Sequence, residues 1–169
     1  MTAKHPSESL TILTDLVLTG ETNSLNNMFG GELLARMDRA GAIAAERHAR
    51  KVVVTASVNH VAFSQPIPLG SVVTVEAKVS RAFTSSMEVI IDVWIEDRKT
   101  GVKTTANQAI YTFVAVDQKG SPVKIPALEP QTELEKERYE AALRRKQLSL
   151  VLAGKMKPGD ATELKALFV

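Results

Sequence analysis

The 169-residue sequence contains no cysteine, which excludes disulfides, thiolate metal sites and cysteine nucleophiles. It also lacks the Gly-x-Ser-x-Gly element of serine esterases, the phosphate-binding loop that ends in Gly-Lys-Ser/Thr, and the Gly-x-Gly-x-x-Gly element of dinucleotide-binding proteins. The three histidines have no metal-ligand spacing with carboxylates. Any reaction that the chain catalyses must therefore depend on other side chains.

Long hydrophobic runs are absent as well. No stretch approaches the roughly 20 apolar residues of a membrane-spanning helix, and the first residues lack the apolar run of a signal peptide. We therefore expect a cytoplasmic protein. A hydrophobic content of 44% and a charged content of 24% are ordinary for one globular domain with a tail. The net charge of +2 indicates no particular partner.

Three consecutive segments alternate apolar and polar residues, at about 71–83, 86–97 and 102–116. Period-two alternation with short turns predicts an antiparallel meander that has one apolar face. Further association of subunits is expected on the other face, where Ile90 and Trp94 lie among charges.

The meander is preceded by a strand at about 9–18, a helix at about 30–48 and a continuous apolar strand at 52–58, which we expect to be covered on both faces. The helix is rich in small residues that allow a curved sheet to approach closely: Ala35, Ala40, Gly41, Ala42, Ala44 and Ala45. This order of elements predicts an α+β fold of the hot-dog type, in which an antiparallel sheet wraps around one long central helix.

The remaining chain forms a helical extension, so we divide the protein into a hot-dog domain at 1–128 and an extension at 129–169. A charged helix is predicted from about 132 to 152 and ends before Gly154. Asp160 and Glu163 resemble a capping pair that opens a last short helix through Phe168.

Asp38 is the residue that fits its predicted position least well. On a helical wheel it falls at about 80° from Gly30, on the side that should face the protein. The charged residues of this helix share a different arc of roughly 160–260°: Glu32, Arg36, Arg39, Glu46 and Arg47. Because burying a bare carboxylate costs several kcal/mol, Asp38 must be paired, hydrogen-bonded or functional.

Three segments resemble the cytosolic acyl-CoA thioesterase family of the hot-dog superfamily. They are the Asn-Asn-Met-Phe-Gly-Gly element at 26–31 followed by Asp38, the segment from Val53 to Pro66, and the segment from Gly70 to Val73. The resemblance covers about residues 9–126. It implies hydrolysis of fatty acyl-CoA without a metal or other cofactor, by homodimers that assemble into hexamers.

Carried over by residue, the resemblance matches Asp38 to a catalytic carboxylate and Asn27 to a catalytic asparagine or aspartate position. Asp38 is then the general base or the nucleophile, and Asn27 orients water. The N–H groups of Gly30 and Gly31, at the start of the helix, are placed to polarise the carbonyl. Substrate-binding residues are expected among Asn59, Phe63, Thr84, Ser85 and Ser86.

Each of these assignments has a structural alternative. Gly30 and Gly31 would then only permit tight entry into the helix, Asn27 would be a cap, and Asp38 a buried acceptor. The serines and threonine at 84–86 would form a plain turn, which is equally favoured. For the basic run 144–146 a solvated helix end is favoured over contact with CoA phosphates, and for His48 and His60 a structural or solvated role is favoured.

Rival functions fit the sequence less well. A hot-dog dehydratase requires a histidine in the active-site region, whereas the helix offers only His48 at its far end. A non-catalytic acyl-CoA sensor that regulates transcription would carry a DNA-binding module ahead of the domain, and only about eight residues precede the first expected strand. A structural lipid-binding role would leave Asp38 unexplained.

Overall fold

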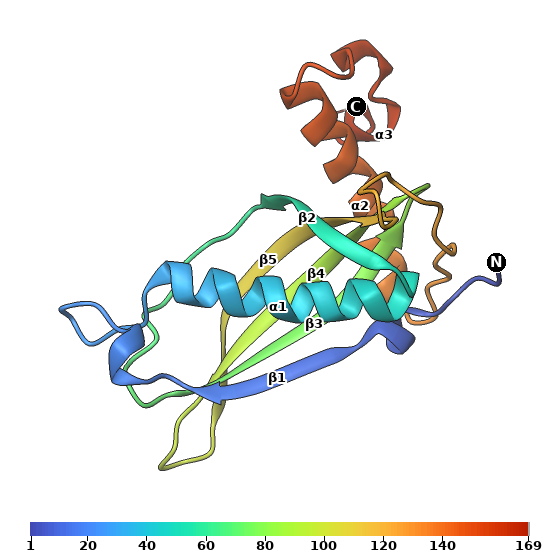
Figure 1. Ribbon diagram of the computed structural model, residues 1–169. Coiled ribbons are helices and arrows are strands. Elements are labelled where there is room, and N and C mark those ends of the chain that lie inside the picture. Colours follow the sequence, from blue (N-terminus) through green and yellow to red (C-terminus); the bar gives the residue numbers. More distant parts are fainter. Residues whose placement is uncertain (169) are drawn as a thin grey trace.

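The computed structural model describes residues 1–168 and confirms the predicted hot-dog architecture. Five strands form one antiparallel sheet in the order β1-β3-β4-β5-β2 (Figure 1). The strands are β1 (Thr11–Leu16), β2 (Val52–Asn59), β3 (Val72–Ala82), β4 (Ser86–Glu96) and β5 (Lys103–Val116). The long helix α1 (Gly30–Ala49) lies across one face, and α2 (Glu133–Leu152) and the short α3 (Thr162–Lys165) follow the sheet. Three short 3-10 turns cover Pro6–Ser9, Thr19–Glu21 and Pro158–Asp160.

The core lies between α1 and the sheet, as the alternating pattern predicts. Successive inward residues of β3, β4 and β5 are buried: Val73, Val75, Ala77, Val79, Met87, Val89, Ile91, Val93, Ala109, Tyr111, Phe113 and Ala115. On the helix, a Cβ at Gly41 would lie 2.8 Å from the ring of Phe113. Any larger residue would push α1 away from β5, so glycine sets the distance between helix and sheet.

One residue of the predicted charged arc is buried. Arg36 is only 5% exposed, whereas helical periodicity placed it in solvent. Its guanidinium donates to the carboxylate of Glu21 at 2.8 Å and to the carbonyl oxygen of Leu16 at 2.9 Å. The end of β1 supplies one acceptor and the following turn supplies the other, and a helical wheel cannot show that these segments lie over this side of the helix.

The prediction that β2 is covered on both faces is wrong for the single chain. β2 is the last strand of the sheet order, so one edge has no neighbouring strand. Its valines Val52, Val54 and Val58 are 63%, 48% and 44% exposed. A run of exposed valines on an open edge is a surface suited to pairing with another chain.

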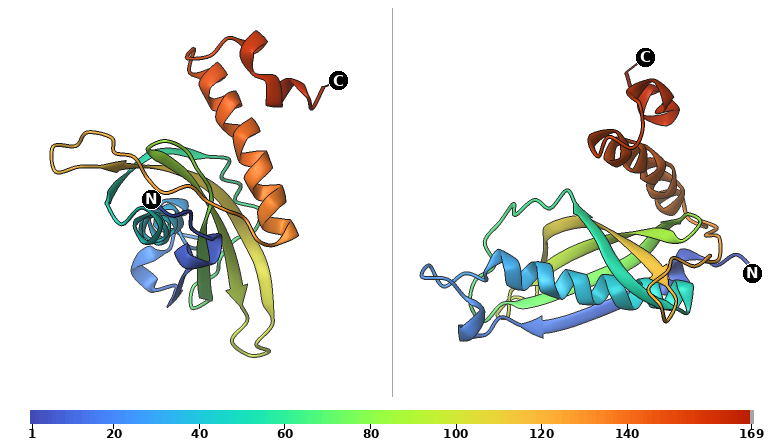
Figure 2. Two further views of the ribbon diagram at one scale, coloured as in Figure 1. Left: turned by 90° about the vertical axis from the view of Figure 1, so that its right-hand side faces the viewer. Right: turned by 45° about the horizontal axis from the view of Figure 1, so that its top comes forward.

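The helix α2 packs against the outer face of the sheet, opposite α1, and its far end projects beyond the sheet (Figure 2). Three ion pairs link it to β3 and β4: Lys78–Glu135 at 3.4 Å, Asp92–Arg138 at 3.0 Å and Glu88–Arg145 at 2.7 Å. Because α2 covers part of this face, Ile90 is buried and cannot mediate the expected further association, whereas Trp94 stays partly exposed. The favoured solvated role of the basic run is likewise wrong for Arg145.

The predicted last helix is shorter than expected. α3 spans only Thr162–Lys165, and its N-cap is Ala161, whose side chain makes no capping bond. Asp160 lies in the preceding 3-10 turn, where its N–H donates to the carbonyl of Lys157, so it cannot open the helix. Gly154 follows α2 with a φ of +69°, in agreement with the predicted end.

His48 has the predicted structural role. It is completely buried, and its Nε2 donates to the carbonyl oxygen of Pro126 at 2.9 Å. Its Nδ1 has no partner among residues 1–168. Burial lowers the pKa of His48, with the charge of Lys4 acting in the same direction. The ring is therefore held neutral in the folded protein.

We expect this histidine to make folding stability fall between about pH 7.5 and 5.5. The unfolded chain takes up the proton near pH 6.5 and the folded chain does so only at lower pH, so the free energy of unfolding falls by up to about 1.4 kcal/mol per pH unit. Urea denaturation of the wild type and His48→Gln at both pH values tests this. His60→Gln, at an exposed histidine, is the matched control. Equal pH dependence in wild type and His48→Gln would contradict the prediction.

Candidate active site

Asp38 lies near the middle of α1, half-buried, on the side that faces the edge strand β2. The hydroxyl of Thr55 on β2 donates to Asp38 Oδ1 at 2.6 Å. The pairing of β2 with β5 shifts register between Thr55 and Ser57, and such bulges re-aim side chains next to functional sites. The predicted oddity is thus resolved as a hydrogen-bonded carboxylate at the open edge of the sheet.

Thr55 was not among the predicted site residues. The signal that would have found it is its chemistry, since Thr55 is a hydroxyl residue that follows three valines at the start of β2. A threonine hydroxyl can rotate to donate a hydrogen bond to a carboxylate, whereas a valine side chain has no donor. Sequence spacing alone does not show which residue of β2 lies opposite Asp38.

Tyr111 on β5 holds the turn of α1 that precedes Asp38. Its hydroxyl donates at 3.0 Å to the carbonyl oxygen of Leu34, which lies one helical turn before Asp38. Burial raises the pKa of Tyr111 to about 12, with a smaller contribution from the Asp38 charge. Tyr111 therefore stays protonated at neutral pH and acts as a donor.

The loop before α1 is held by its own asparagines. The side-chain oxygen of Asn23 accepts the N–H groups of Leu25 and Asn27 at 2.9 and 3.2 Å, and the N–H of Asn23 donates to the carbonyl of Asn27 at 2.9 Å. Asn26 adopts the left-handed region with a φ of +56°, which asparagine tolerates. Asn27 is thus placed by a compact turn directly ahead of the helix.

The start of α1 leaves two donors free. Both Glu32 and Leu33 direct their N–H groups to the carbonyl oxygen of Phe29, whereas the N–H groups of Gly30 and Gly31 have no acceptor within residues 1–168. A Cβ on Gly30 would lie 3.1 Å from the ring of Phe63. The glycine lets this ring approach the helix start, where the helix dipole also favours negative charge.

A cavity of about 320 Å³ opens beside these donors. It is lined by residues from the asparagine loop, the helix start and the Phe63 loop, among them Asn23, Asn27, Gly30, Phe63 and Asn107. The structure therefore brings together three of the predicted site residues, Asn27, Gly30 and Phe63, with Asn23 of the same loop and Asn107 of β5.

The other predicted substrate-binding residues lie elsewhere. Asn59 and Ser86 line a groove of about 690 Å³ between α2 and the outer face of β2 and β5. Thr84 and Ser85 form the turn that leads into β4, and their carbonyl oxygens accept N–H groups of Ile125 and Ala115. The two hollows thus contain different parts of the sequence-predicted set, and Asp38, Gly31, Thr84 and Ser85 line neither of them.

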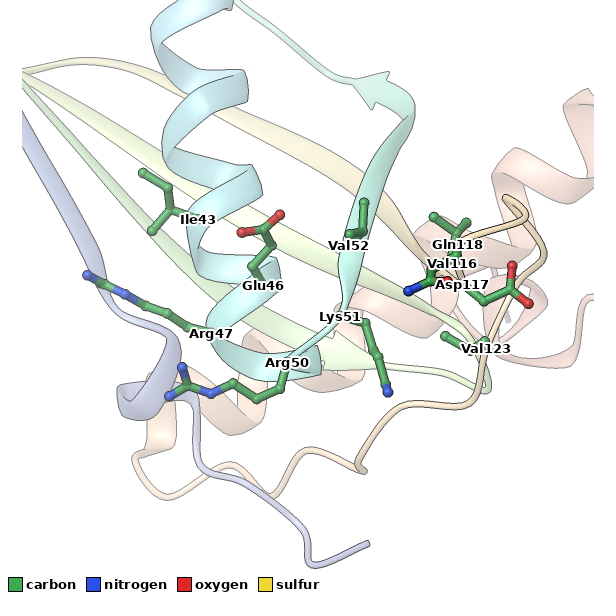
Figure 3. A pocket seen from close by; sticks show the side chains of 10 residues that line it. All are labelled: Ile43, Glu46, Arg47, Arg50, Lys51, Val52, Val116, Asp117, Gln118 and Val123. Carbon is green, nitrogen blue, oxygen red and sulfur yellow. The ribbon is translucent and has the colours of Figure 1, made fainter.

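A third hollow, of about 720 Å³, lies at the end of α1 (Figure 3). Ile43 and Val52 form an apolar part of it, and Glu46, Arg47, Arg50 and Lys51 surround this part with charges of both signs. None of the predicted catalytic residues lines it. It belongs instead to the exposed side of α1 and β2.

Within one chain, Asp38 and the helix start are too far apart for one carbonyl group. Eight residues of helix separate Gly30 from Asp38, which corresponds to about 12 Å along the axis. The structure thus places a carboxylate with its threonine at one point of α1, and free N–H donors with the asparagine loop at another.

Residues 1–168 contain no group of three or more histidine, aspartate or glutamate side chains arranged to hold a metal ion. Among the same residues, no helix combines the length and the apolar character that crossing a bilayer requires.

Comparisons with known proteins show which family the chain resembles. The family described as the thioesterase superfamily matches residues 25–102. The uncharacterized acyl-CoA thioester hydrolase YkhA of Bacillus subtilis is 39% identical over 138 residues, which cover 82% of this chain and 80% of that protein. The corresponding hydrolase YciA of Escherichia coli is 34% identical over 118 residues, with coverages of 68% and 89%.

Solved structures give the same result. The crystal structure of an apo hexameric acyl-CoA thioesterase superposes with a TM-score of 0.87 at 38% identity, covering 90% of this chain and 98% of that one. An acyl-CoA hydrolase from Staphylococcus aureus in complex with butyryl-CoA and CoA superposes with a TM-score of 0.83 at 36% identity, with coverages of 97% and 99%.

Fold and relatives together define a hot-dog enzyme of the thioesterase class. Within this class, the chain belongs to the acyl-CoA thioesterase family.

Proposed function

We propose that this protein hydrolyses the thioester of fatty acyl-CoA to a free fatty acid and CoA. The observation that carries the proposal is the Asp38 carboxylate held by Thr55 at an open sheet edge, in a chain related to acyl-CoA thioester hydrolases. No metal or other cofactor takes part in the proposed reaction. We further propose that the enzyme acts in the cytoplasm.

Two mechanisms use the same groups. As a general base, Asp38 takes a proton from water while the oxygen adds to the carbonyl carbon, and the C–S bond then breaks to release the CoA thiolate, which takes up the proton. As a nucleophile, Asp38 displaces the thiolate itself, and water then cleaves the resulting anhydride. In both, the N–H groups of Gly30 and Gly31 stabilise the oxyanion, a contribution of about 3–4 kcal/mol in other enzymes.

The related S. aureus enzyme favours Asn23 as the partner of Asp38. Aspartate-to-alanine, threonine-to-alanine and asparagine-to-alanine variants of that enzyme have been crystallised. The altered asparagine precedes the altered aspartate by 15 positions, and the altered threonine follows it by 17. Asn23, Asp38 and Thr55 have the same spacing here, whereas Asn27 precedes Asp38 by only 11. We therefore propose Asn23 as the water-orienting residue and Asn27 as its neighbour in the cavity.

We propose that the complete site forms between two chains. The exposed valines of β2 allow two copies to join their sheets edge to edge, which also buries the apolar side of α1 around Ile43. A two-fold axis then brings the loop of one chain close to Asp38 and Thr55 of the other. Hexameric neighbours support further assembly of such dimers.

Dimerisation is directly testable. We expect a dimer or larger assembly at micromolar concentration, measured by light scattering. Val54→Glu places a charge on the exposed edge and should shift the assembly toward monomers, whereas Leu148→Glu, an equally exposed apolar position on α2, should not. A wild-type monomer would contradict the proposed interface.

Asp38→Asn should lower kcat by roughly 10²–10⁴, the scale of a lost general base, because the amide keeps the shape but cannot accept the proton. Release of free thiol from a panel of acyl-CoA chain lengths measures it and also reports the chain-length preference. Circular dichroism verifies folding. Retention of most activity by a folded Asp38→Asn variant would show that this mechanism is wrong.

Complementation tests the shared site. Asn23→Ala mixed with Asp38→Asn should recover about a quarter of wild-type activity, since about half the dimers become mixed and each then holds one intact site. Asp38→Asn mixed with Thr55→Ala is the control, because both changes affect the same half-site and no intact site can form. Repeating the mixing experiment with Asn27→Ala in place of the Asn23→Ala variant shows which asparagine the activity requires. No recovery despite verified subunit exchange would place all groups within one chain.

A further inference from the structure

Two cations gather around one aromatic ring on the outer face of the sheet. Lys146 Nζ of α2 lies 3.6 Å from the centroid of the Phe83 ring, and the Arg81 guanidinium lies 5.7 Å from it. Arg81 also stacks on Tyr139, at 4.1 Å, and donates to the Tyr139 carbonyl oxygen at 3.0 Å. We call Arg81, Phe83 and Lys146 the cation cluster.

Within residues 1–168, no carboxylate neutralises this cluster. Three acidic residues that face α2 or belong to it pair with other cations: Glu135 with Lys78, Asp92 with Arg138, and Glu88 with Arg145. Lys146 takes part in no ion pair or hydrogen bond of the described chain, and Arg81 in no ion pair. Two like charges therefore lie together beside three ion pairs, without a carboxylate partner of their own in that part of the chain.

The cluster borders a hollow large enough for a ligand. Lys146 and Phe83 line the groove of about 690 Å³ under α2, together with Lys155. Hydroxyl and amide side chains also line it: Ser57, Asn59, Ser86, Thr112 and Ser149. Glu88 and Arg145 line it too, and they are paired with each other. Partial burial lowers the pKa of Lys146, with the charge of Arg81 acting in the same direction. An anion in the groove would relieve both effects.

We propose that the cation cluster binds a phosphate group of an organic ligand in this groove. A phosphate offers several charged acceptor oxygens to an arginine, a lysine and nearby hydroxyls, and its charge of up to −2 matches the two cations. This site lies outside the catalytic groups described above.

The position of the groove relates it to the reaction. Ser86 on β4 pairs with Val114 on β5, and Val114 pairs with Val54 on β2. Ser86, on one side of the groove, thus lies about 10 Å, or two strand spacings, from Val54, the residue before Thr55. The other side of the groove reaches β2 at Ala56 and Ser57. If the proposed function holds, the phosphate-bearing end of the substrate's CoA is one source of this phosphate. A free phosphate-bearing ligand is the other.

The first experiment compares acyl-CoA with acyl-pantetheine of the same chain length, which has no phosphate. Lys146→Met removes the charge and keeps an apolar stem on Phe83. If the phosphate belongs to CoA, KM for acyl-CoA rises about tenfold, and KM for acyl-pantetheine and kcat stay unchanged. Lys136→Met, which removes the same charge at the other end of α2 outside the groove, is the control and should leave both KM values unchanged.

The second experiment measures binding directly by calorimetry, with CoA, pantetheine and pyrophosphate. Loss of pyrophosphate binding in Lys146→Met, with both KM values unchanged, assigns the cluster to a free phosphate-bearing ligand. Wild-type affinity of Lys146→Met for CoA and pyrophosphate, or no binding of either by the wild type, overturns the proposal. If the wild type cleaves neither thioester, the proposed function fails, but calorimetry with CoA and pyrophosphate still decides whether the cluster binds phosphate.

Discussion

The close approach of α1 to the sheet is the constraint on which the rest of the structure depends. Gly41 leaves no room for a side chain against Phe113, and the buried Ala40 and Ala44 extend the same small-residue face. Because the helix lies so near, Tyr111 can reach the carbonyl of Leu34 and Thr55 can reach Asp38. A larger residue at position 41 would separate helix and sheet, and would thereby disturb both hydrogen bonds that hold the catalytic turn.

The same helix explains why one chain is insufficient. α1 is one continuous helix that carries free N–H donors at its first two residues and a carboxylate about 12 Å further along. The carboxylate also lies at the strand whose edge is open and whose valines are exposed. The carboxylate that lacks nearby N–H donors and the exposed valines of β2 therefore lie at the same place, and a second copy of the chain would supply the donors and cover the valines.

Much of this could be predicted from the sequence, because alternation in β3 to β5 and the small-residue helix depend on local periodicity. The exceptions depend on which elements become neighbours. Arg36 is buried because the turn around Glu21 folds over it, and Ile90 because α2 covers the outer face. The run at 52–58 was predicted to be covered on both faces, since apolar content cannot distinguish a central strand from an edge that awaits a partner. Thr55 was missed because the spacing of residues in the sequence does not reveal the strand register near a bulge.

The outer face of the sheet carries both ion pairs and cations that have no acidic partner within residues 1–168. Charges along an alternating strand usually indicate a solvated surface, yet Glu88 is buried and bound by Arg145, and Asp92 is bound by Arg138. α2 is thus attached by matched ions whose main effect is to fix its position, since exchanging water for an ion pair contributes little net stability. Beside these ion pairs, Arg81 and Lys146 differ because they repel each other and have no carboxylate partner among the described residues. Unpaired charge of one sign beside a groove is a reason to look for a ligand of the other sign.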